Sequence, residues 1–544
     1  MDSQRRSEPL LWYPKGVTDT LDATETPAGS MQNLSNLVPD PSTPNLWQCR
    51  PASFKLTSFS GFTTPGFISA LLVAGNFAYG MIATGRNAGH DEPFVYNIVT
   101  NTFVTVTGTI TMATTPASPA TSGAWVPPIM DIIGSKVVVT HQGFAAGTNF
   151  IGWIDISTPA TPVWNAGNLS GAITFSTVPT FVAQFANRAY YIVNATQPAL
   201  VFSDVLNATN VTNGTQSLTF DDVVPLTALG QLRLYNQLGG IIQALIVFKG
   251  TQNCYQITGD AATSNLARNA LNVATGTSAP LALAPTKAGL AFISPEGLRI
   301  IDFTGTVSDP LGRYGKGVSL PFIYSNVPSR MTMKATGDTV RISTQNANAF
   351  GTPQQEWWYH MTKEAWSGPH TFPCSQIEAF GSTFIIAPIG VTGSLWQSDA
   401  VQSAASTFTE NNVALTYLYQ TAFLPNLRKM SNYAVSFSTL DIALAPGTSV
   451  SVTGIVPGNK ALDVTQISVS GTSTIWGSFT WGGALWGGVQ TQLLPRIIAW
   501  HFPLVFAKFA IEVTGPSNNL TQIGCLALRY KMLRYLEDIT ALSA

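Results

Sequence analysis

The stretch "RAYYIVNATQPALVFSD", residues 188–204, contains two apolar runs separated by a turn, and it ends in a carboxylate. β-Branched and aromatic residues flank a turn rich in Asn, Gln and Pro, which is the composition of two short antiparallel strands. The pattern recurs without gaps in three more windows of seventeen residues: "ALIVFKGTQNCYQITGD" (244–260), "TKAGLAFISPEGLRIID" (286–302) and "TFIIAPIGVTGSLWQSD" (383–399). The sequence therefore predicts a β-hairpin that repeats along the middle of the chain.

Looser copies of this hairpin bring the number of end points to seven. The end points are Asn97, Asp155, Asp204, Asp260, Asp302, His360 and Asp399. They are spaced 58, 49, 56, 42, 58 and 39 residues apart. A repeat of about 50 residues is typical of four-stranded propeller blades. We therefore expect an all-β protein with a β-propeller of about seven blades over residues 56–405.

A cluster of aromatic residues, "QEWWYHMTKEAWSGPH" at 355–370, fits the same scheme as a third strand, a turn and an outer strand. Side chains on a strand alternate between its two faces, so Trp357 and Tyr359 point one way while Glu356, Trp358 and His360 point the other. We expect the aromatic rings to fill the space between blades. His360 occupies the position held elsewhere by Asp or Asn, where a short polar side chain can cap the following turn.

The same cluster has an alternative interpretation as a functional site. His360 together with Glu356, Glu364 or His370 has the residue types of a metal site or a general base. The repeat favours the structural interpretation, because the position of His360 is defined by the hairpin pattern.

The two ends of the chain differ from the repeat. Residues 1–55 are rich in Pro, Thr and Asn with scattered apolar residues, which predicts an extended N-terminal arm that is ordered by packing on another subunit or on an adjoining ring of the same assembly. Residues 406–544 contain apolar strands without the carboxylate hairpin, which predicts a C-terminal β-sandwich domain.

Inside the predicted sandwich, the Trp/Gly-rich loop "WGSFTWGGALWGG" at 476–488 places Trp476, Trp481 and Trp486 five residues apart. Flat aromatic rings on a flexible backbone suit a loop that contacts a partner or a glycan. A Gly-rich β-corner packed by Trp is the alternative.

Composition restricts the classes of function. Only 10% of the 544 residues are charged and the formal net charge is -1, so the chain lacks the clustered Lys and Arg that neutralise phosphates. Cys49, Cys254, Cys374 and Cys525 show no zinc spacing, and we interpret them as reduced thiols. We expect no metal and no cofactor.

Two patterns bear on localisation. The N-terminus has no apolar stretch of about 7 to 15 residues behind its basic residues, so we expect synthesis in the cytoplasm without a secretory signal. Residues 65–83 are the one candidate membrane span, but their Pro, Asn and Gly favour two buried strands.

Motifs of catalysis are absent from the sequence. It contains no Gly-x-Ser-x-Gly elbow, no His-Glu-x-x-His and no Walker loop, and its five His residues are scattered. It also lacks the Ser-x-Asp-x-Gly-x-Thr-Trp turns of sialidase-like propellers. We therefore expect a protein that is not an enzyme. The alternative hypothesis of a secreted glycan-cleaving propeller enzyme has little support, because no distinct carboxylate pair stands out in the sequence.

A series of motifs resembles one known family. The opening segment at 16–52, "LVFSDVLNATNV" at 200–211, "ALIVFKGTQNCYQITGD", "GLAFISPEGLRIID" and "WWYHMTKEAWSGPHTFP" are similar, in this order, to the tail nozzle (distal tail tube) proteins of short-tailed bacteriophages. The resemblance covers about residues 15–400. It implies a virion protein of the tail, assembled as a six-fold ring that forms the last part of the channel through which DNA leaves, with no catalytic residues.

The resemblance also implies partners: other copies of the chain, adjoining tail adaptor or hub proteins, double-stranded DNA that passes without tight binding, and tail fibres or the host surface. The main alternative is a host-receptor or glycan-binding propeller adhesin of a phage tail, with Trp476, Trp481 and Trp486 as its stacking surface.

Overall fold

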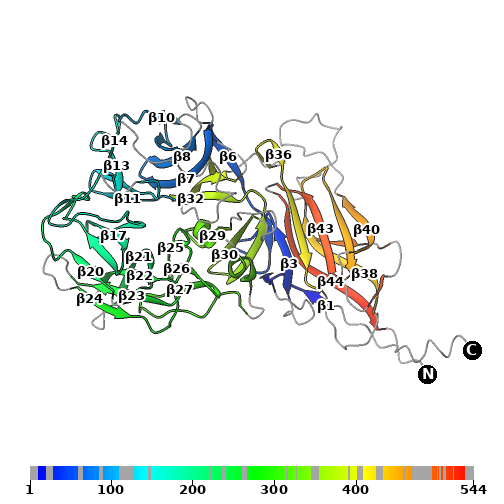
Figure 1. Ribbon diagram of the computed structural model, residues 1–544. Helices are drawn as coiled ribbons and strands as arrows, with labels where there is room; N and C mark the ends of the chain where they lie inside the picture. The colour runs from blue at the N-terminus through cyan, green and yellow to red at the C-terminus, as the bar shows by residue number, and fades with distance from the viewer. Residues whose placement is uncertain are drawn as a thin grey trace, which may run out of the picture.

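The computed structural model shows an all-β protein made of a ring of small sheets beside a two-sheet sandwich (Figure 1). It describes residues 10–532 except 20–28, 59–64, 85–89, 109–126, 145–148, 221, 236–240, 260–265, 314–316, 326, 345–353, 390–392, 401–407, 424–432, 457–459, 469–492, 499, 501–503, 507–509 and 519. Within these residues, helix is limited to α1 (Leu320–Ile323) and the 3-10 turn η2 (Pro328–Arg330).

The ring consists of seven antiparallel units of three or four strands, each beginning with its innermost strand. The first four are β7–β10 (Pro65–Ala74, Phe77–Thr84, His90–Asn97, Thr102–Val104), β11–β14 (Ile129–Ile133, Lys136–Thr140, Ile151–Asp155, Val163–Gly167), β16, β17, β18 and β20 (Phe181–Phe185, Arg188–Asn194, Pro198–Phe202, Ser217–Thr219), and β21–β24 (Leu226–Tyr235, Ile241–Lys249, Asn253–Thr258, Ala267–Ala270). The last three are β25–β27 (Leu283–Thr286, Gly289–Ser294, Gly297–Ile301), β28–β31 (Thr332–Thr336, Thr339–Thr344, Gln355–His360, Ala365–His370), and β32–β34 with β6 (Cys374–Phe380, Thr383–Pro388, Ser394–Ala400, Ala52–Ser58).

These units form a closed propeller. Each innermost strand contacts the innermost strand of the next unit, and β32 of the last contacts β7 of the first. The prediction of seven blades is confirmed. Residues 65–83, the candidate membrane span, lie in the hairpin of β7 and β8, and none of the helices in the described part of the chain is long and apolar enough to cross a membrane.

The repeated end points occupy equivalent positions in the blades. Asn97, Asp155 and His360 end the third strands, Asp204 and Asp302 follow them within two residues, and Asp399 lies in β34. Asp260 lies outside the described residues. The carboxylate of Asp302 accepts hydrogen bonds from the backbone N–H groups of Thr304 and Thr306, at 2.8 and 2.9 Å. The repeat therefore has a local cause, because the side chain at the strand end caps the turn.

The second body is a β-sandwich. One sheet has the order β4 (Leu37–Pro39), β5 (Trp47–Cys49), β44 (Gln522–Met532), β38 (Tyr433–Ala443) and β41 (Leu494–Ile498), with β1 (Leu10–Trp12) on β44 and β42 (Leu504–Phe506) on β38. The other contains β3 (Ser30–Ser35), β37 (Thr416–Thr421), β43 (Ala510–Pro516), β39 (Ser449–Val456) and β40 (Lys460–Ser468), with β2 (Gly16–Val17) on β3. Two short pairs lie outside these sheets, β15 (Ser170–Gly171) with β19 (Asn210–Val211), and β35 (Thr409–Glu410) with β36 (Val413–Ala414).

The predicted extended arm at residues 1–55 is wrong for the part that the structure describes. Strands β1 to β5 belong to the sandwich, and β6 is the outer strand of the last blade. Their apolar side chains are buried in this chain's own core: Met31, Leu34, Leu37 and Trp47 are at most 1% exposed. The physical reason is that buried backbone groups need partners, and the sheets of the same chain provide them. The sandwich is therefore built from both ends of the sequence.

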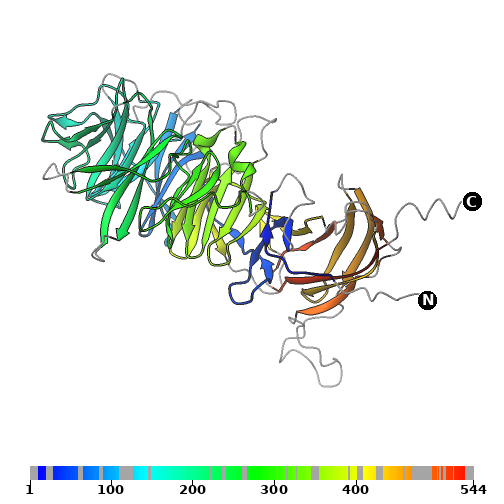
Figure 2. The same cartoon turned by 90° about the horizontal axis from the view of Figure 1, so that it is seen from below.

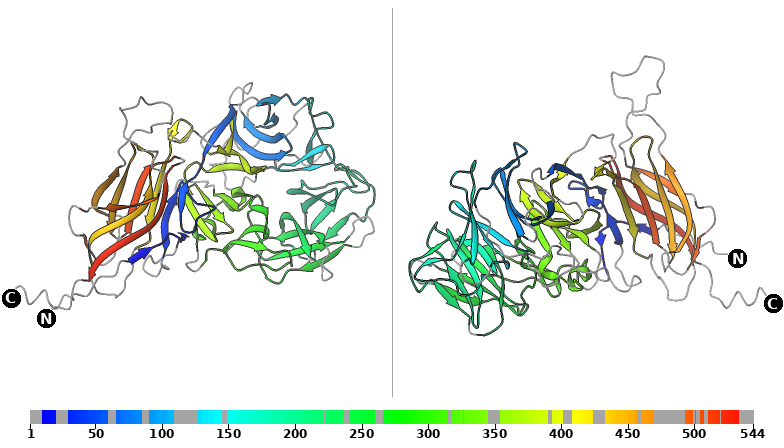
Figure 3. Two further views of the ribbon diagram at one scale, coloured as in Figure 1. Left: turned by 180° about the vertical axis from the view of Figure 1, so that it is seen from behind. Right: turned by 45° about the horizontal axis from the view of Figure 1, so that its top comes forward.

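The two bodies are joined by a shared sheet. The outer strand of the sixth blade, β31, pairs with β3 of the sandwich, which makes one sheet that runs from β28 to β40. One hydrophobic cluster continues across the junction, from Met333 and Trp357 in the blade to Tyr419 and Val513 in the sandwich. Figures 2 and 3 show from other sides that the N-terminal strands, in dark blue, lie between the propeller and the sandwich.

We predict that deletion of residues 1–58 destabilises the propeller as well as the sandwich, because it removes the outer strand of the last blade. Thermal unfolding followed by circular dichroism should show a melting midpoint lowered by many degrees. Phe54→Ser is the matched control, since the Phe54 side chain is 57% exposed on the same strand. A truncated chain that melts like the full chain would contradict this closure.

Candidate functional site

The predicted contact residues Trp476, Trp481 and Trp486 lie outside the described residues. Their role in binding a partner or a glycan stays a prediction. Polar side chains gather at the junction between the sixth blade and the sandwich, and in the central channel of the propeller.

Strand β30 carries the aromatic cluster, and its side chains alternate as predicted. Trp357 and Tyr359 belong to the core cluster that crosses the junction, and the Tyr359 ring centroid lies 5.0 Å from that of Trp366. Glu356 and His360 take part in separate polar contacts and are 2% and 5% exposed. Both faces of the strand are therefore buried, which leaves no face open to a substrate.

Glu356 is part of a buried ion pair within the sixth blade, next to the seventh. Its Oε1 accepts a hydrogen bond from Arg341 Nε at 2.5 Å and another from Trp358 Nε1 at 2.8 Å. The Arg341 guanidinium lies over the Trp358 ring, 4.5 Å from its centroid, and Arg341 also donates to the hydroxyl of Ser398 in β34. Hydrogen bonds and a cation–π contact thus compensate for the removal of these charges from water.

His360 and His370 are linked through Ser367. The backbone N–H of Asn36 donates to His370 Nδ1 at 3.0 Å, and the Ser367 hydroxyl lies 3.0 Å from Nε2 of both imidazoles. Burial lowers the pKa of His360 to about 3. Burial, with Arg50 and Arg341 nearby, lowers the pKa of His370 well below its ordinary value. Both rings are neutral at pH 7 and enclosed by their partners, so the geometry favours the structural interpretation over a general base.

The predicted turn cap at His360 is wrong. Its ring turns inward to Ser367, and the carboxylate of Asp338 caps the turn instead, accepting the N–H of Thr362 at 2.9 Å. The imidazole is longer than an Asp or Asn side chain and has a buried partner in β31. Within the described residues, no group of three or more His, Cys, Asp and Glu is placed to hold a metal ion.

Arg50 is the centre of a second polar cluster, where the chain passes from the sandwich to the propeller. Its guanidinium binds both carboxylate oxygens of Glu410 at 2.8 Å. It also donates to Asn36 Oδ1 at 2.8 Å and to the carbonyls of Pro51 and Thr371 at 3.1 and 3.0 Å. All five donors of the guanidinium are used. Arg50 therefore links the two chain segments that connect the sandwich and the propeller, one before β6 and one after β34, to the end of the sixth blade.

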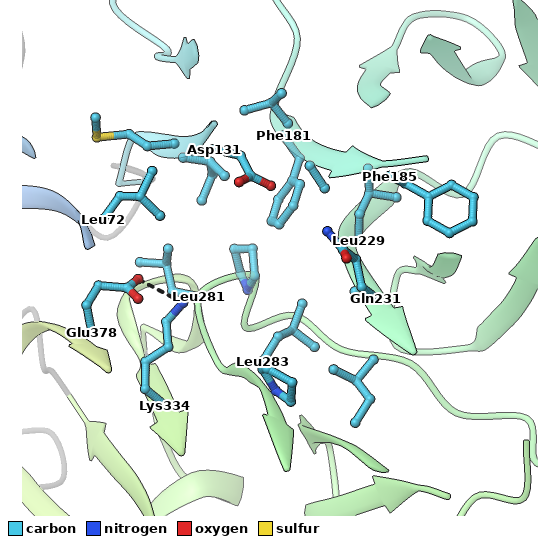
Figure 4. A pocket seen from close by; sticks show the side chains of 18 of the residues that line it. Leu72, Asp131, Phe181, Phe185, Leu229, Gln231, Leu281, Leu283, Lys334 and Glu378 are labelled. Atoms are coloured by element: carbon cyan, nitrogen blue, oxygen red, sulfur yellow. Dashed lines mark ion pairs between the residues drawn. The ribbon is translucent and has the colours of Figure 1, made fainter. Parts of the chain in front are cut away.

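The central channel of the propeller holds a cavity of about 700 Å³, which is lined by residues of all seven innermost strands. Figure 4 shows Leu72, Phe181, Leu229, Leu281 and Leu283 around it, with three charged groups. One is the Asp131 carboxylate, and the other two are Lys334 and Glu378, whose ion pair has a length of 2.8 Å. Sequence reasoning missed this site, because its residues come together only when the ring of blades closes.

The four cysteines are unpaired, as predicted. Cys49, Cys254 and Cys374 are buried and Cys525 is partly buried. Burial raises the pKa of Cys49 to about 11 and that of Cys254 to about 12. These two thiols are therefore protonated at pH 7, and such thiols react slowly.

The comparisons with known proteins find no related family and only weak matches among solved structures. No protein-family model matches the chain, and no curated protein matches it. Among solved structures, BBS1N in complex with ARL6DN matches at 9% identity and a TM-score of 0.35, over 64% of this chain and 97% of that chain. Raptor of Chaetomium thermophilum matches at 7% identity and a TM-score of 0.36, over 65% of this chain and 29% of that chain. At such scores, the propeller assignment rests on the strand topology itself.

We predict that Glu410→Gln lowers the free energy of unfolding by about 3 to 5 kcal/mol, because it leaves the Arg50 charge buried without a counter-ion. Chemical denaturation of the full chain measures the change. Lys287→Ala is the control: it breaks the exposed ion pair with Asp338 and should cost below about 1 kcal/mol. Equal losses for the two variants would contradict the role of the buried pair.

We also predict a pH dependence that is specific to His360. The pKa of His360 is about 3 in the folded chain and 6.5 in an ordinary environment. As the pH falls, the imidazole is therefore protonated in the unfolded state before it is protonated in the folded state. The contribution of the neutral His360 imidazole to the free energy of unfolding is complete above pH 6.5 and is lost as the pH falls toward 3. Between pH 6.5 and 4.5, the unfolding free energy of the natural chain should fall by about 2 kcal/mol more than that of His360→Asn. A His360 imidazole that titrates near pH 6.5 in NMR spectra would contradict this prediction.

Proposed function

We propose that this chain is a non-enzymatic structural protein of a short-tailed phage: a tail nozzle subunit that assembles into a hexameric ring around the terminal DNA ejection channel. The observation that carries the proposal is the order of the family-like motifs along residues 15–400. The chain is made in the host cytoplasm and resides in the virion tail, where it contacts its own copies and the adjoining tail adaptor or hub proteins.

In this proposal the DNA passes between subunits and not through a propeller. A cavity of about 700 Å³ has the size of a small-molecule site, which ranges from about 300 to 1,000 Å³. A B-DNA duplex, with grooves about 12 and 6 Å wide, is too large for it. The channel for DNA is therefore the axis of the ring, and each propeller is part of the wall of that channel.

The charge of the chain supports this function. A channel through which a polyanion slides works best when it makes few phosphate contacts, since each neutralised phosphate adds to affinity. The formal net charge of -1 and the low content of Lys and Arg meet that requirement. Contacts between subunits should bury apolar and neutral polar surface with few ion pairs.

The rigid junction fits the same role. The shared sheet, the continuous core and the buried Arg50–Glu410 pair hold the propeller and the sandwich in one orientation. A ring closes only if the angle between neighbouring subunits is fixed, so a rigid subunit favours a defined stoichiometry.

The second candidate is a receptor-binding or glycan-binding adhesin of a phage tail. The observation that favours it is the threefold Trp-Gly repeat, because aromatic rings stack on apolar sugar faces. The two functions differ in the stage at which the protein is needed: a nozzle subunit is needed for tail assembly, and an adhesin is needed for adsorption to the host.

We predict that mass spectrometry of purified virions detects this chain in stoichiometric amounts and that immunogold labelling places it at the tail tip. Phage that lack the gene should form incomplete tails. Replacing Trp476, Trp481 and Trp486 together by Ala should leave assembly intact. Virions without this chain, or glycan hydrolysis that one carboxylate substitution abolishes, would overturn the proposal. Complete tails that fail to adsorb after the Trp substitutions would favour the adhesin.

A further inference from the structure

The central cavity of the propeller has the features of a ligand site, independently of any role in a tail. Its volume of about 700 Å³ lies within the range of small-molecule pockets, and its wall is mainly Leu, Ile, Phe and Pro. The charged groups converge from different blades: Asp131 from the second, Arg233 from the fourth, Lys334 from the sixth and Glu378 from the seventh. We propose that the cavity binds a small organic cation, an ammonium group on an apolar body, with Asp131 as its counter-ion.

Asp131 is held in place for such a role. Its Oδ1 accepts the backbone N–H of Ile132 at 2.8 Å, and its Oδ2 accepts the N–H of Gln184 in the neighbouring blade at 2.6 Å. Each carboxylate oxygen has a further lone pair. Among the described residues, no Lys, Arg or His forms an ion pair with Asp131. The carboxylate is thus fixed in orientation, and the cation whose charge acts on it, Lys334, forms its ion pair with Glu378.

When the exposed Arg233 is set aside, the remaining charged groups of the cavity wall carry one excess negative charge. Lys334 pairs with Glu378 at 2.8 Å, which makes those two groups neutral together. Arg233 contributes to the lining but is exposed, so water screens its charge. Burial raises the pKa of Asp131 and that of Glu378, whereas the positive charge of Lys334 lowers both. A bound cation would act on the Asp131 carboxylate in the same direction as Lys334.

The side chains of the cavity wall indicate the chemistry of the part of the ligand that carries the ammonium group. Leu72, Phe181, Leu229, Leu281 and Leu283 surround the space next to Asp131 (Figure 4). Burial of apolar atoms against such side chains contributes about 25 cal/mol for each Å² removed from water. An apolar chain or ring that carries one ammonium group therefore matches the cavity better than a sugar or a phosphate.

Isothermal titration calorimetry of the full chain tests the proposal with 4-phenylbutylammonium as the probe. The matched ligands 4-phenylbutanoate and 4-phenylbutanol keep the body and change the charge of the head group. We expect the ammonium to bind at least tenfold more tightly than either. Asp131→Asn should lower its association constant at least tenfold, whereas Asp309→Asn, at an exposed carboxylate outside the cavity, should leave it unchanged.

A second variant keeps the test independent of the hydrogen bonds that Asp131 accepts. Leu281→Trp fills the cavity without changing its charge and should abolish binding. Circular dichroism confirms that each variant is folded. Tighter binding of the butanoate, no detectable binding of the ammonium, or ammonium binding that survives both Asp131→Asn and Leu281→Trp would each overturn the proposal.

Discussion

The pairing of β6 with β34 is the constraint on which the rest of the structure depends. Seven blades close into a ring only if the last blade is complete, and its outer strand comes from the segment before the first blade. Strands β1 to β5, which precede β6, belong to the sandwich, and so do strands β37 to β44, which follow the propeller. The propeller is therefore an insertion into the sandwich, and neither body can be cut from the other at a single point in the chain.

The two connections created by this insertion are fixed by buried polar groups. Arg50 lies just before β6, Glu410 lies beyond the last blade, and their ion pair joins the entry of the propeller to its exit. A buried ion pair contributes little net stability compared with apolar packing, but it tolerates few alternative geometries. We infer that its role is to define the angle between the two bodies, while β31 and β3 carry the sheet across the junction.

The repeat could be predicted from the sequence because its cause is local: each hairpin and its capping side chain lie within about twenty residues. The N-terminal strands could not, because their partners are distant. Leu10 pairs with Leu528, and strands of two or three residues leave no periodic pattern. The central cavity was missed for a related reason. Asp131 lies on a short apolar strand, and only ring closure brings it to the same channel as Lys334 and Glu378.

Some of the few charged side chains of this protein are buried in its interior. Three ion pairs, Arg50–Glu410, Arg341–Glu356 and Lys334–Glu378, lie in the interior, and only Lys334 has a side chain as much as 30% exposed. Arg341–Glu356 lies within the sixth blade, whereas Lys334–Glu378 connects the sixth blade to the seventh. The outer surface is therefore even poorer in charge than the composition suggests. In the proposed ring, contacts between subunits would rest on apolar surface and on hydrogen bonds of Thr, Asn and Gln, which salt screens weakly because no net charge is involved. A ring built in this way would hold its geometry over a wide range of ionic strength, while the passing polyanion would meet few fixed charges.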